Sequence, residues 1–301
     1  MKCNLCPRNC NVDREKGEKG YCGALNEMVI ARYSLHMWEE PVISGDNGSG
    51  TIFFSYCNMR CCFCQNYEIS ELHKGRVVSV DEFSDICLEL QEKGANNINL
   101  VTPTHFVHLI KEGLRLAKEK GLVIPIVYNS SAYENVETIK MLEGLVDIYL
   151  PDLKYYNDEL AIRYSNSPNY FKYASKAIEE MVRQVGDLEY DSKGMLRKGV
   201  IVRLLLLPSN VGDSKRIIKY LYETYQDKII ISIMNQYTPV RELKYEELNR
   251  RVTDDEYDEL VNYAYDMGVR NAFMQEEETQ KESFIPDFDV FKADSVKMFW
   301  N

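Results

Sequence analysis

The sequence predicts an α/β fold: a partial (β/α)6 barrel of the TIM type, preceded by a small cysteine-rich metal-binding extension. From about residue 51, six short apolar runs alternate with longer segments of helical periodicity, as in repeated βα units. The runs are almost entirely apolar, as in 200–207, which is typical of strands covered on both faces of a parallel sheet. A doubly wound open sheet is the alternative, but the first run lacks the Gly-x-Gly-x-x-Gly turn that often follows it there.

The expected strands are short runs rich in β-branched residues. Between them, apolar residues recur on one helical face, as at Phe106, Ile110 and Leu114. Right-handed crossovers would wind six such units into one curved sheet. We expect strands at 51–56, 97–102, 123–128, 146–151, 200–207 and 229–234, and helices near 81–93, 106–114, 133–144, 170–186, 213–226 and 254–267.

Composition narrows the class of protein. The chain has 301 residues, of which 45% are hydrophobic and 28% charged, as in globular rather than disordered proteins. Its net charge of −11 argues against nucleic acid or a membrane surface as partner. No apolar run approaches the ~18 residues of a spanning helix, and the first residues show no signal-peptide core. We therefore expect a cytoplasmic protein.

Cysteine is concentrated near the start of the chain, with eight of nine residues among the first 64. Disulfide frameworks belong to small secreted domains, so closely spaced thiols in this long chain indicate metal binding. We expect a metal-binding extension at 1–48 and a barrel domain at 49–301 that ends in a helical, acidic segment. Residues 241–301 contain 16 acidic and 8 basic side chains, which predict a solvated face and tail.

The most informative motif follows the first predicted strand, where Cys57, Cys61 and Cys64 have the spacing Cys-x3-Cys-x2-Cys. Three thiolates can bind three irons of a cubane cluster and leave the fourth iron open. The loop would lie at the carboxyl ends of the barrel strands, where such folds place their chemistry. Cys57-x4-Cys62-x-Cys64 is an alternative ligand set, but we assign Cys62 to packing and Cys87 to the core. A zinc knuckle is the competing interpretation.

Cys57-x3-Cys61-x-Phe63-Cys64 resembles the signature of the radical S-adenosylmethionine superfamily. The resemblance implies a [4Fe-4S] cluster on the three cysteines, with its open iron bound by the amino and carboxylate groups of S-adenosylmethionine. It further implies that one electron, from a donor such as flavodoxin or ferredoxin, breaks a C–S bond of the cofactor. The resulting 5′-deoxyadenosyl radical would abstract hydrogen from a substrate, and Phe63 would lie against the adenine.

Downstream, the chain is similar to the pyruvate formate-lyase activating enzyme-like group, which activates glycyl-radical proteins. Residues 50–54 resemble the first strand of those enzymes, and Asp152-Leu153-Lys154 resembles the end of their fourth strand. Asp152 and Lys154 project to one side by the period of two. A carboxylate can hold ribose hydroxyls or a cation, and an ammonium can pair with the methionyl carboxylate. A surface ion pair is the alternative.

Other strand ends carry further candidate cofactor contacts. Thr102-Pro103-Thr104-His105 stands where those activating enzymes have Gly-Gly-Glu, and the hydroxyls could replace the glutamate; equally, Thr104 could cap a helix that starts at a surface His105. Arg203, inside an apolar strand, requires a carboxylate partner. Met234-x-Gln236-Tyr237 matches a run of the same group. The expected contacts are Phe63, Thr102, Thr104, Asn129, Ser130, Asp152, Lys154, Arg203 and Gln236.

A second cysteine set lies at the start of the chain. Cys3, Cys6, Cys10 and Cys22 provide four thiolates, which saturate either tetrahedral zinc or a second [4Fe-4S] cluster. Spacing alone does not select between these metals. A larger group related to the pyruvate formate-lyase activating enzyme resembles this chain in opening with Cys-x2-Cys-Pro-Arg-x-Cys.

Together these observations predict a radical S-adenosylmethionine enzyme, with a glycine of a partner enzyme as one candidate substrate. Radical modification of another protein or of a metabolite is an alternative within that chemistry. Two other classes remain as hypotheses: an iron–sulfur electron-transfer or redox-sensing protein, and a zinc-organised binding module.

Overall fold

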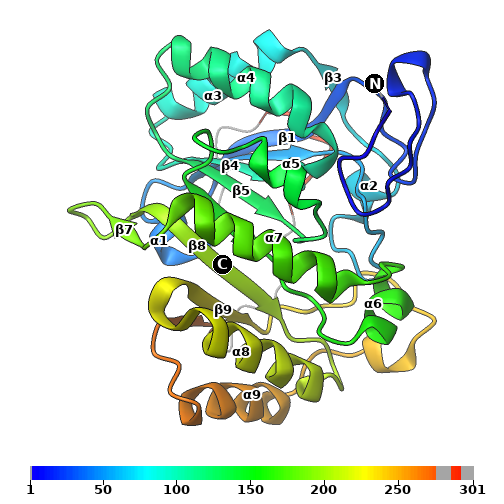
Figure 1. Ribbon diagram of the computed structural model, residues 1–301, viewed down its shortest axis with the longest axis vertical. Helices are drawn as coiled ribbons and strands as arrows, with labels where there is room; N and C mark the ends of the chain where they lie inside the picture. Colours follow the sequence, from blue (N-terminus) through cyan, green and yellow to red (C-terminus); the bar gives the residue numbers. More distant parts are fainter. Residues whose placement is uncertain (1, 276–285, 293–301) are drawn as a thin grey trace.

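The computed structural model describes residues 2–275 and 286–292. In this part of the chain the strands form one sheet with the order β10-β9-β8-β6-β5-β4-β2-β1-β3, and β7 pairs with β8. The strands from β2 to β10 along this order are parallel, whereas β1 is antiparallel to β2 and β3. Figure 1 shows the long helices arranged around this sheet.

All six predicted strands are present and parallel. The strand expected at 123–128 begins later, because Pro125 lacks the N–H that a ladder position needs. The prediction missed four further strands, of which β1 falls inside the cysteine-rich extension; the boundary at residue 48 stays a prediction. The strands are β1 Met28–His36, β2 Ser49–Phe54, β3 Arg76–Val78, β4 Ile98–Val101, β5 Ile126–Ser130, β6 Ile148–Pro151, β7 Glu189–Tyr190, β8 Leu196–Leu205, β9 Ile230–Met234 and β10 Ala272–Met274.

The long helices lie close to their predicted positions. The helix expected at 133–144 is shorter because residues 141–145 form a turn, and α6, capped by the Asn157 side chain, was not predicted. The helices are α1 Pro41–Ser44, α2 Tyr67–Ser70, α3 Val80–Glu92, α4 Val107–Glu119, α5 Val136–Lys140, α6 Asp158–Ser165, α7 Tyr170–Val185, α8 Val211–Tyr225 and α9 Asp254–Asp266. Cys87 on α3 is fully buried, as predicted.

The two faces of the sheet have different partners. Alternate strand residues such as Ile52, Leu100 and Val202 pack in one large core with the long helices. The intervening residues, among them Val127 and Ile201, face the interior of the curved sheet. Because the long helices share one face, the fold is a partial barrel rather than a doubly wound sheet.

The short helix α1 closes one end of the barrel interior. Its Ile43 is fully buried against Val127, Ile148, Ile201 and Ile230 from four neighbouring strands. Strand residues two positions further along the chain point into the same interior. The apolar contact therefore forms a floor, and the side chains toward the carboxyl ends of the strands lie above it.

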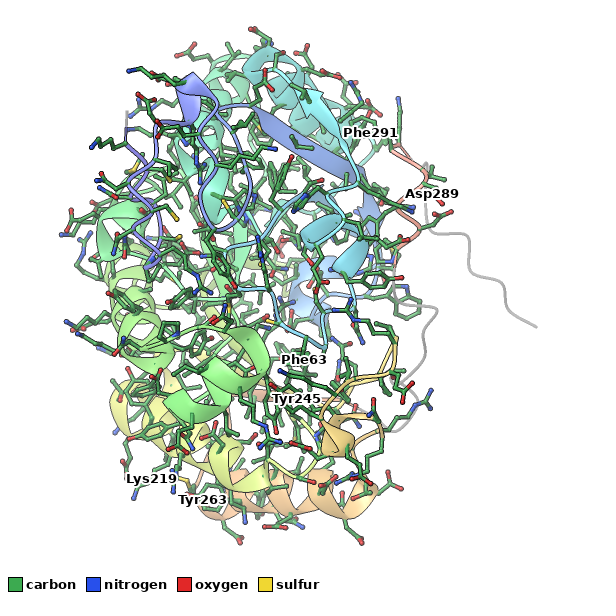
Figure 2. All side chains as sticks on the ribbon, turned by 90° about the vertical axis from the view of Figure 1, so that its right-hand side faces the viewer. Phe63, Lys219, Tyr245, Tyr263, Asp289 and Phe291 are labelled. Atoms are coloured by element: carbon green, nitrogen blue, oxygen red, sulfur yellow. The ribbon has the colours of Figure 1, made fainter. Side chains whose placement is uncertain are left out.

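Residues 286–292 lie along β1 beyond the end of β3. The amide of Tyr33 donates to the carbonyl of Phe291, and the two rings pack edge to face. Phe288 is buried against Phe53 of β2. Figure 2 shows Asp289 and Phe291 together at this side of the molecule. Within the described ranges no helix is long and apolar enough to cross a membrane. Of the acidic segment expected at 241–301, residues 276–285 and 293–301 lie outside those ranges.

Candidate cluster and cofactor site

The loop after β2 brings Cys57, Cys61 and Cys64 to the carboxyl end of the barrel, as the sequence predicts. The residues before the first two cysteines, Tyr56 and Arg60, have φ values of 72° and 69°. Non-glycine residues rarely adopt this left-handed conformation, and it is frequent at functional sites. The backbone of the cluster loop thus has an uncommon conformation directly before Cys57 and directly before Cys61.

Polar groups of the same loop approach the sulfur atoms. The amide of Met59 lies 3.4 Å from Sγ of Cys57, and the Ser70 hydroxyl lies 3.4 Å from Sγ of Cys64. The amide of Cys64 donates to the carbonyl of Cys61 at 3.1 Å. Donors placed at sulfur stabilise the thiolate form, which is the form that binds iron.

Burial, with a contribution from the nearby Cys57 and Cys64, raises the pKa of Cys61 to about 12 against the lowering effect of Lys154. Burial also raises the pKa of Cys64. Cys57 thus acts on the pKa of both Cys61 and Cys64, and Lys154 lowers the pKa of the same two thiols. Three adjacent thiolates, with Cys61 buried and the other two half-buried, would be costly without a cation, and a bound metal cluster would reduce that cost.

The described Cys, His, Asp and Glu side chains do not form a group of three that converges on a single metal ion. A cubane cluster makes a different demand, because each thiolate binds a separate iron. The three-thiol loop, its donors and the adjacent Lys154 fit such a cluster by their chemistry.

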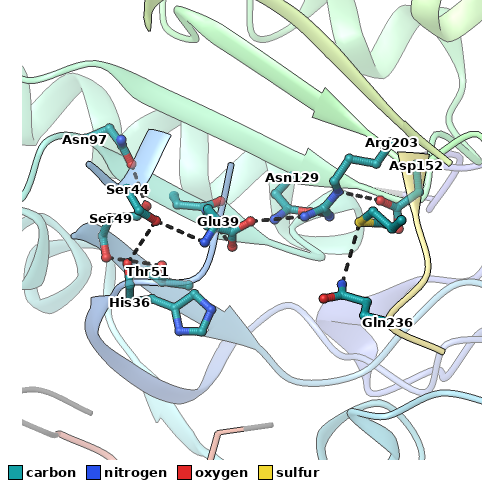
Figure 3. Close-up of polar contacts among 12 residues, drawn as sticks. His36, Glu39, Ser44, Ser49, Thr51, Asn97, Asn129, Asp152, Arg203 and Gln236 are labelled. Atoms are coloured by element: carbon teal, nitrogen blue, oxygen red, sulfur yellow. Dashed lines mark hydrogen bonds and ion pairs between the residues drawn. The ribbon is translucent and has the colours of Figure 1, made fainter. Parts of the chain in front are cut away.

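Above the apolar floor, Arg203 joins three strands through one guanidinium group, as Figure 3 shows. It donates to Oδ1 of Asp152 at 2.7 Å, to Oε2 of Glu39 at 3.1 Å and to Oδ1 of Asn129 at 2.5 Å. Lys154 donates to the other Asp152 oxygen at 2.7 Å. The expectation of a carboxylate for Arg203 is confirmed, and Asp152 and Lys154 form a largely buried pair rather than a surface one.

The charges of this network stabilise one another. Burial acts to raise the pKa of Asp152, but Arg203 and Lys154 hold it below its ordinary value. Burial acts to lower the pKa of Lys154, and Asp152 keeps it raised. The ammonium group therefore stays charged beside the cysteine loop, where it can pair with a ligand carboxylate.

Sequence reasoning missed Glu39 and Glu40, which enter the barrel interior from the segment before α1. Glu39 also accepts from Asn99 at 2.9 Å, and burial raises the pKa of both glutamates while Arg203 opposes it. Oε2 of Glu40 has no hydrogen-bond partner among the described residues. Acidic residues are usually exposed, so the pattern carried no signal except the need of Arg203 for a counter-charge.

The threonines expected to replace Gly-Gly-Glu have other surroundings. Thr102 directly follows β4 and has φ 59°, and the Thr104 hydroxyl donates to the buried Glu134 at 2.7 Å rather than capping a helix. Tyr128 and Ser130 also hydrogen-bond to Glu134, and burial raises the pKa of Glu134 to about 7. Their roles as cofactor contacts stay predictions.

Phe63, expected against the adenine, and Gln236, a further expected cofactor contact, both lie at the segment that follows β9. Phe63, which is labelled in Figure 2, is buried and packs edge to face against Tyr237. The Gln236 carbonyl accepts from Gln65, and its side-chain oxygen accepts from Gln275. Cys62 is turned toward Arg241, which donates to the Cys62 carbonyl and acts on the pKa of its thiol.

The four N-terminal cysteines lie in a mostly irregular segment that packs on the barrel. Arg14 approaches Sγ of Cys22 at 3.3 Å and donates to the carbonyl of His105 at 2.6 Å. Burial raises the pKa of Cys6 to about 12, and Cys22 and Cys3 add to that shift. His105 is buried and contacts the Ser55 carbonyl, so the expectation of a surface histidine was wrong. The helical turn at 104–106 is covered by the N-terminal segment, which sequence spacing did not reveal.

Together the fold and the site define an α/β-barrel protein with a three-cysteine loop at the mouth of the barrel. The family model described as Radical SAM superfamily matches residues 51–221. The chain belongs to the Radical SAM superfamily, which implies an enzyme that uses a [4Fe-4S] cluster and S-adenosylmethionine.

The chain is also similar to curated proteins and to solved structures. The chain is 31% identical over 273 residues to an uncharacterized protein of Methanocaldococcus jannaschii, covering 87% of this chain and 74% of the relative. A radical SAM methyltransferase from Sphaerobacter thermophilus has a TM-score of 0.52 at 15% identity, over 75% of this chain and 66% of that chain. SuiB of Streptococcus suis bound to S-adenosylmethionine has a TM-score of 0.51 at 11% identity, over 79% and 55%.

Each of these two solved structures is longer than its region of similarity to this chain. This chain spans 66% of the methyltransferase and 55% of SuiB. At these identities the likeness concerns the fold: an α/β barrel with a mostly parallel sheet.

Proposed function

We propose that this protein binds a [4Fe-4S] cluster through Cys57, Cys61 and Cys64 and uses it to cleave S-adenosylmethionine reductively. The observation that carries the proposal is the proximity of Lys154 to Cys61 and Cys64 at the mouth of the barrel. This arrangement places a cation suited to a carboxylate ligand beside the three-thiol loop. The cluster and cofactor would supply a 5′-deoxyadenosyl radical, which abstracts hydrogen from a substrate.

The residues of the chain would then bind and orient the cofactor. Lys154 is suited to the methionyl carboxylate because Asp152 keeps it charged. Asp152 is in turn fixed by Arg203, which leaves little freedom for the pair to turn away. Phe63 offers an apolar ring near the loop for the adenine.

We propose a glycine of a partner enzyme as the substrate, as in the pyruvate formate-lyase activating enzyme-like group. Support comes from the Asp152-Leu153-Lys154 strand end and the motif match. A flavodoxin or ferredoxin would supply the electron. The test is electron paramagnetic resonance on a glycyl-radical protein incubated anaerobically with this enzyme, reductant and S-adenosylmethionine. A doublet with glycyl Hα splitting is expected. If cofactor cleavage proceeds without that doublet, another protein or a metabolite is the substrate.

An iron–sulfur electron-transfer protein is the alternative from a different class. It predicts four protein ligands for each cluster and no spectral response to S-adenosylmethionine. The open iron proposed here predicts a change in the spectrum of the reduced cluster when S-adenosylmethionine is added to wild-type protein. An unchanged spectrum would favour electron transfer.

A further inference from the structure

The first 24 residues contact the cluster loop directly. Arg8 donates from Nε to the carbonyl of Asn58 at 2.9 Å and from a terminal nitrogen to the carbonyl of Met59 at 3.3 Å. Asn58 follows Cys57, and the Met59 amide approaches Sγ of Cys57. Arg8 itself lies two residues after Cys6. One side chain therefore connects the two cysteine sets.

Tyr21 makes a second connection. Its amide lies 3.2 Å from Sγ of Cys10, and its hydroxyl donates to the carbonyl of Met59 at 3.0 Å. The ring lies between two guanidinium groups, with the central carbon of Arg8 3.7 Å and that of Arg60 4.5 Å from its centroid. Arg60 also donates to the Tyr21 carbonyl at 2.6 Å. These contacts hold Arg60, the residue before Cys61, in its left-handed conformation.

The four N-terminal thiols are chemically suited to a second cluster, in which each sulfur binds an iron of its own. N–H groups reach two of the sulfurs, from Tyr21 to Cys10 and from Arg14 to Cys22. Gly20 permits the close approach, because a Cβ there would lie 2.9 Å from Sγ of Cys10. Burial is the largest cause of the raised pKa of both Cys22 and Cys6. Cys3 and Cys10 add to the shift of Cys22, and Cys22 and Cys3 add to that of Cys6. Donors directed at sulfur favour thiolates, and four thiolates saturate a cubane. The described thiols do not converge on a single ion such as zinc.

We propose that Cys3, Cys6, Cys10 and Cys22 bind a metal centre of their own, and that this centre holds the radical-cluster loop in place through Tyr21 and Arg8. The inference rests on the proposed function, in which Cys57, Cys61 and Cys64 carry the radical cluster. Tyr21 and Arg8 are positioning residues: they contact the loop backbone, not the cluster or the cofactor.

The physical reason is the conformational freedom of the N-terminal loop. Residues 2–24 contain one short 3₁₀ turn as regular structure, Arg14–Lys16. A metal that joins residues 3, 6, 10 and 22 closes loops within this segment and reduces the freedom of its unliganded state. Arg8 and Tyr21 lie inside those loops, so the metal would orient both side chains toward Asn58 and Met59. Without it, the cluster loop loses three hydrogen bonds that fix its backbone.

The experiment uses the full chain, purified anaerobically, with iron, sulfide and zinc counted per chain. A variant with Cys57, Cys61 and Cys64 all changed to Ala reports the N-terminal centre alone. A Cys6→Ser/Cys22→Ser variant reports the radical cluster alone. The second readout is the rate at which an iron chelator removes iron from the radical cluster. Tyr21→Ala, Tyr21→Phe and Arg8→Ala leave all seven ligands in place, and the exposed Tyr190→Ala is the matched control.

The triple variant should retain iron and sulfide, as a second iron–sulfur cluster. Cys6→Ser/Cys22→Ser and Tyr21→Ala should release iron about tenfold faster than wild type, as expected for one or two lost hydrogen bonds. Tyr21→Phe should show a smaller increase, and Tyr190→Ala none.

Absence of metal from a folded triple variant would overturn the site, and wild-type iron release in Tyr21→Ala and Arg8→Ala would overturn the coupling. If the double-serine variant does not fold, the tyrosine and arginine variants still decide the second point. A triple variant that kept all the wild-type iron would instead refute the proposed function and leave the N-terminal centre standing.

Discussion

Arg203 and Asp152 are joined twice, once through side chains and once through the backbone. Nε of Arg203 donates to Oδ1 of Asp152 at 2.7 Å, and the Arg203 carbonyl accepts from the amide of Leu153 at 2.8 Å. These bonds continue the pairing of β6 with β8 beyond the end of β6. The position of Lys154 beside the cysteine loop therefore depends on a residue of the neighbouring strand.

Replacing Arg203 by Ala should destabilise the fold strongly. The change leaves Asp152 and Glu39 buried without their shared cation, which typically costs about 3–5 kcal/mol. Urea unfolding of the metal-free protein measures the free energy of unfolding. Arg203→Lys keeps the positive charge but loses the forked guanidinium, so its free energy of unfolding should lie between those of wild type and Arg203→Ala. Equal stability of wild type and Arg203→Ala would show that the network is not coupled as described.

Replacing Lys154 by Met should weaken S-adenosylmethionine binding with little effect on folding, because Asp152 keeps Arg203. We expect a loss of about tenfold or more in affinity, as for a charge-assisted hydrogen bond. Anaerobic equilibrium dialysis of the cluster-loaded protein measures it. Lys140→Met, which removes an exposed ion pair with Glu137, is the control. Wild-type affinity in Lys154→Met would remove Lys154 from the cofactor site.

Glu134 should give a pH dependence of stability. Burial raises its pKa from 4.5 to about 7, so between these values the folded protein keeps a proton that the unfolded chain releases. Its contribution is full below about pH 4.5 and declines as the pH rises to about 7, by up to about 3 kcal/mol. The buried His105, with its pKa lowered to about 3, acts in the opposite direction.

The difference between wild type and Glu134→Gln isolates the glutamate, because the histidine contributions cancel. Unfolding by urea from about pH 5 to about pH 7.5 should show the variant gaining stability relative to wild type as the pH rises. A constant difference across that range would contradict the raised pKa.

Gly20→Ala should lower the metal content of the N-terminal centre. The added Cβ would lie 2.9 Å from both Cβ and Sγ of Cys10, so that one of the ligands has to move. The matched control is Gly212→Ala on α8, where a Cβ meets nothing within 4 Å. Metal analysis of the two proteins should show a loss in the first and none in the second. Equal metal contents would place Gly20 outside the site.

The parallel core of the fold was predictable because strands covered on both faces appear in the sequence as continuous apolar runs. Strand β1 was not, since Arg32 and His36 interrupt its apolar residues and it pairs antiparallel with β2 and β3, outside the parallel βα repeat. Spacing likewise identified both cysteine sets, which are local features. It did not place them against one another, because the contacts of Arg8 and Tyr21 reach 38 to 51 residues along the chain.

The polar interior shows the same limit. A buried Arg203 required a carboxylate, and Asp152 was within reach of that argument because its motif ends the adjacent strand. Glu39 could not be predicted as a second partner of Arg203, because two acidic residues before a proline are typical of a solvated turn. Thr104 has a local alternative in helix capping, and only the fold reveals its partner Glu134.

The central claim is that Cys57, Cys61 and Cys64, and not Cys62, support reductive cleavage of S-adenosylmethionine. The most direct measurement is chromatographic quantification of 5′-deoxyadenosine after anaerobic reconstitution with iron, sulfide, dithionite and S-adenosylmethionine. Wild type and Cys62→Ala should form it, and Cys61→Ala should not. No product from reconstituted wild type, or undiminished product from Cys61→Ala, would contradict the account.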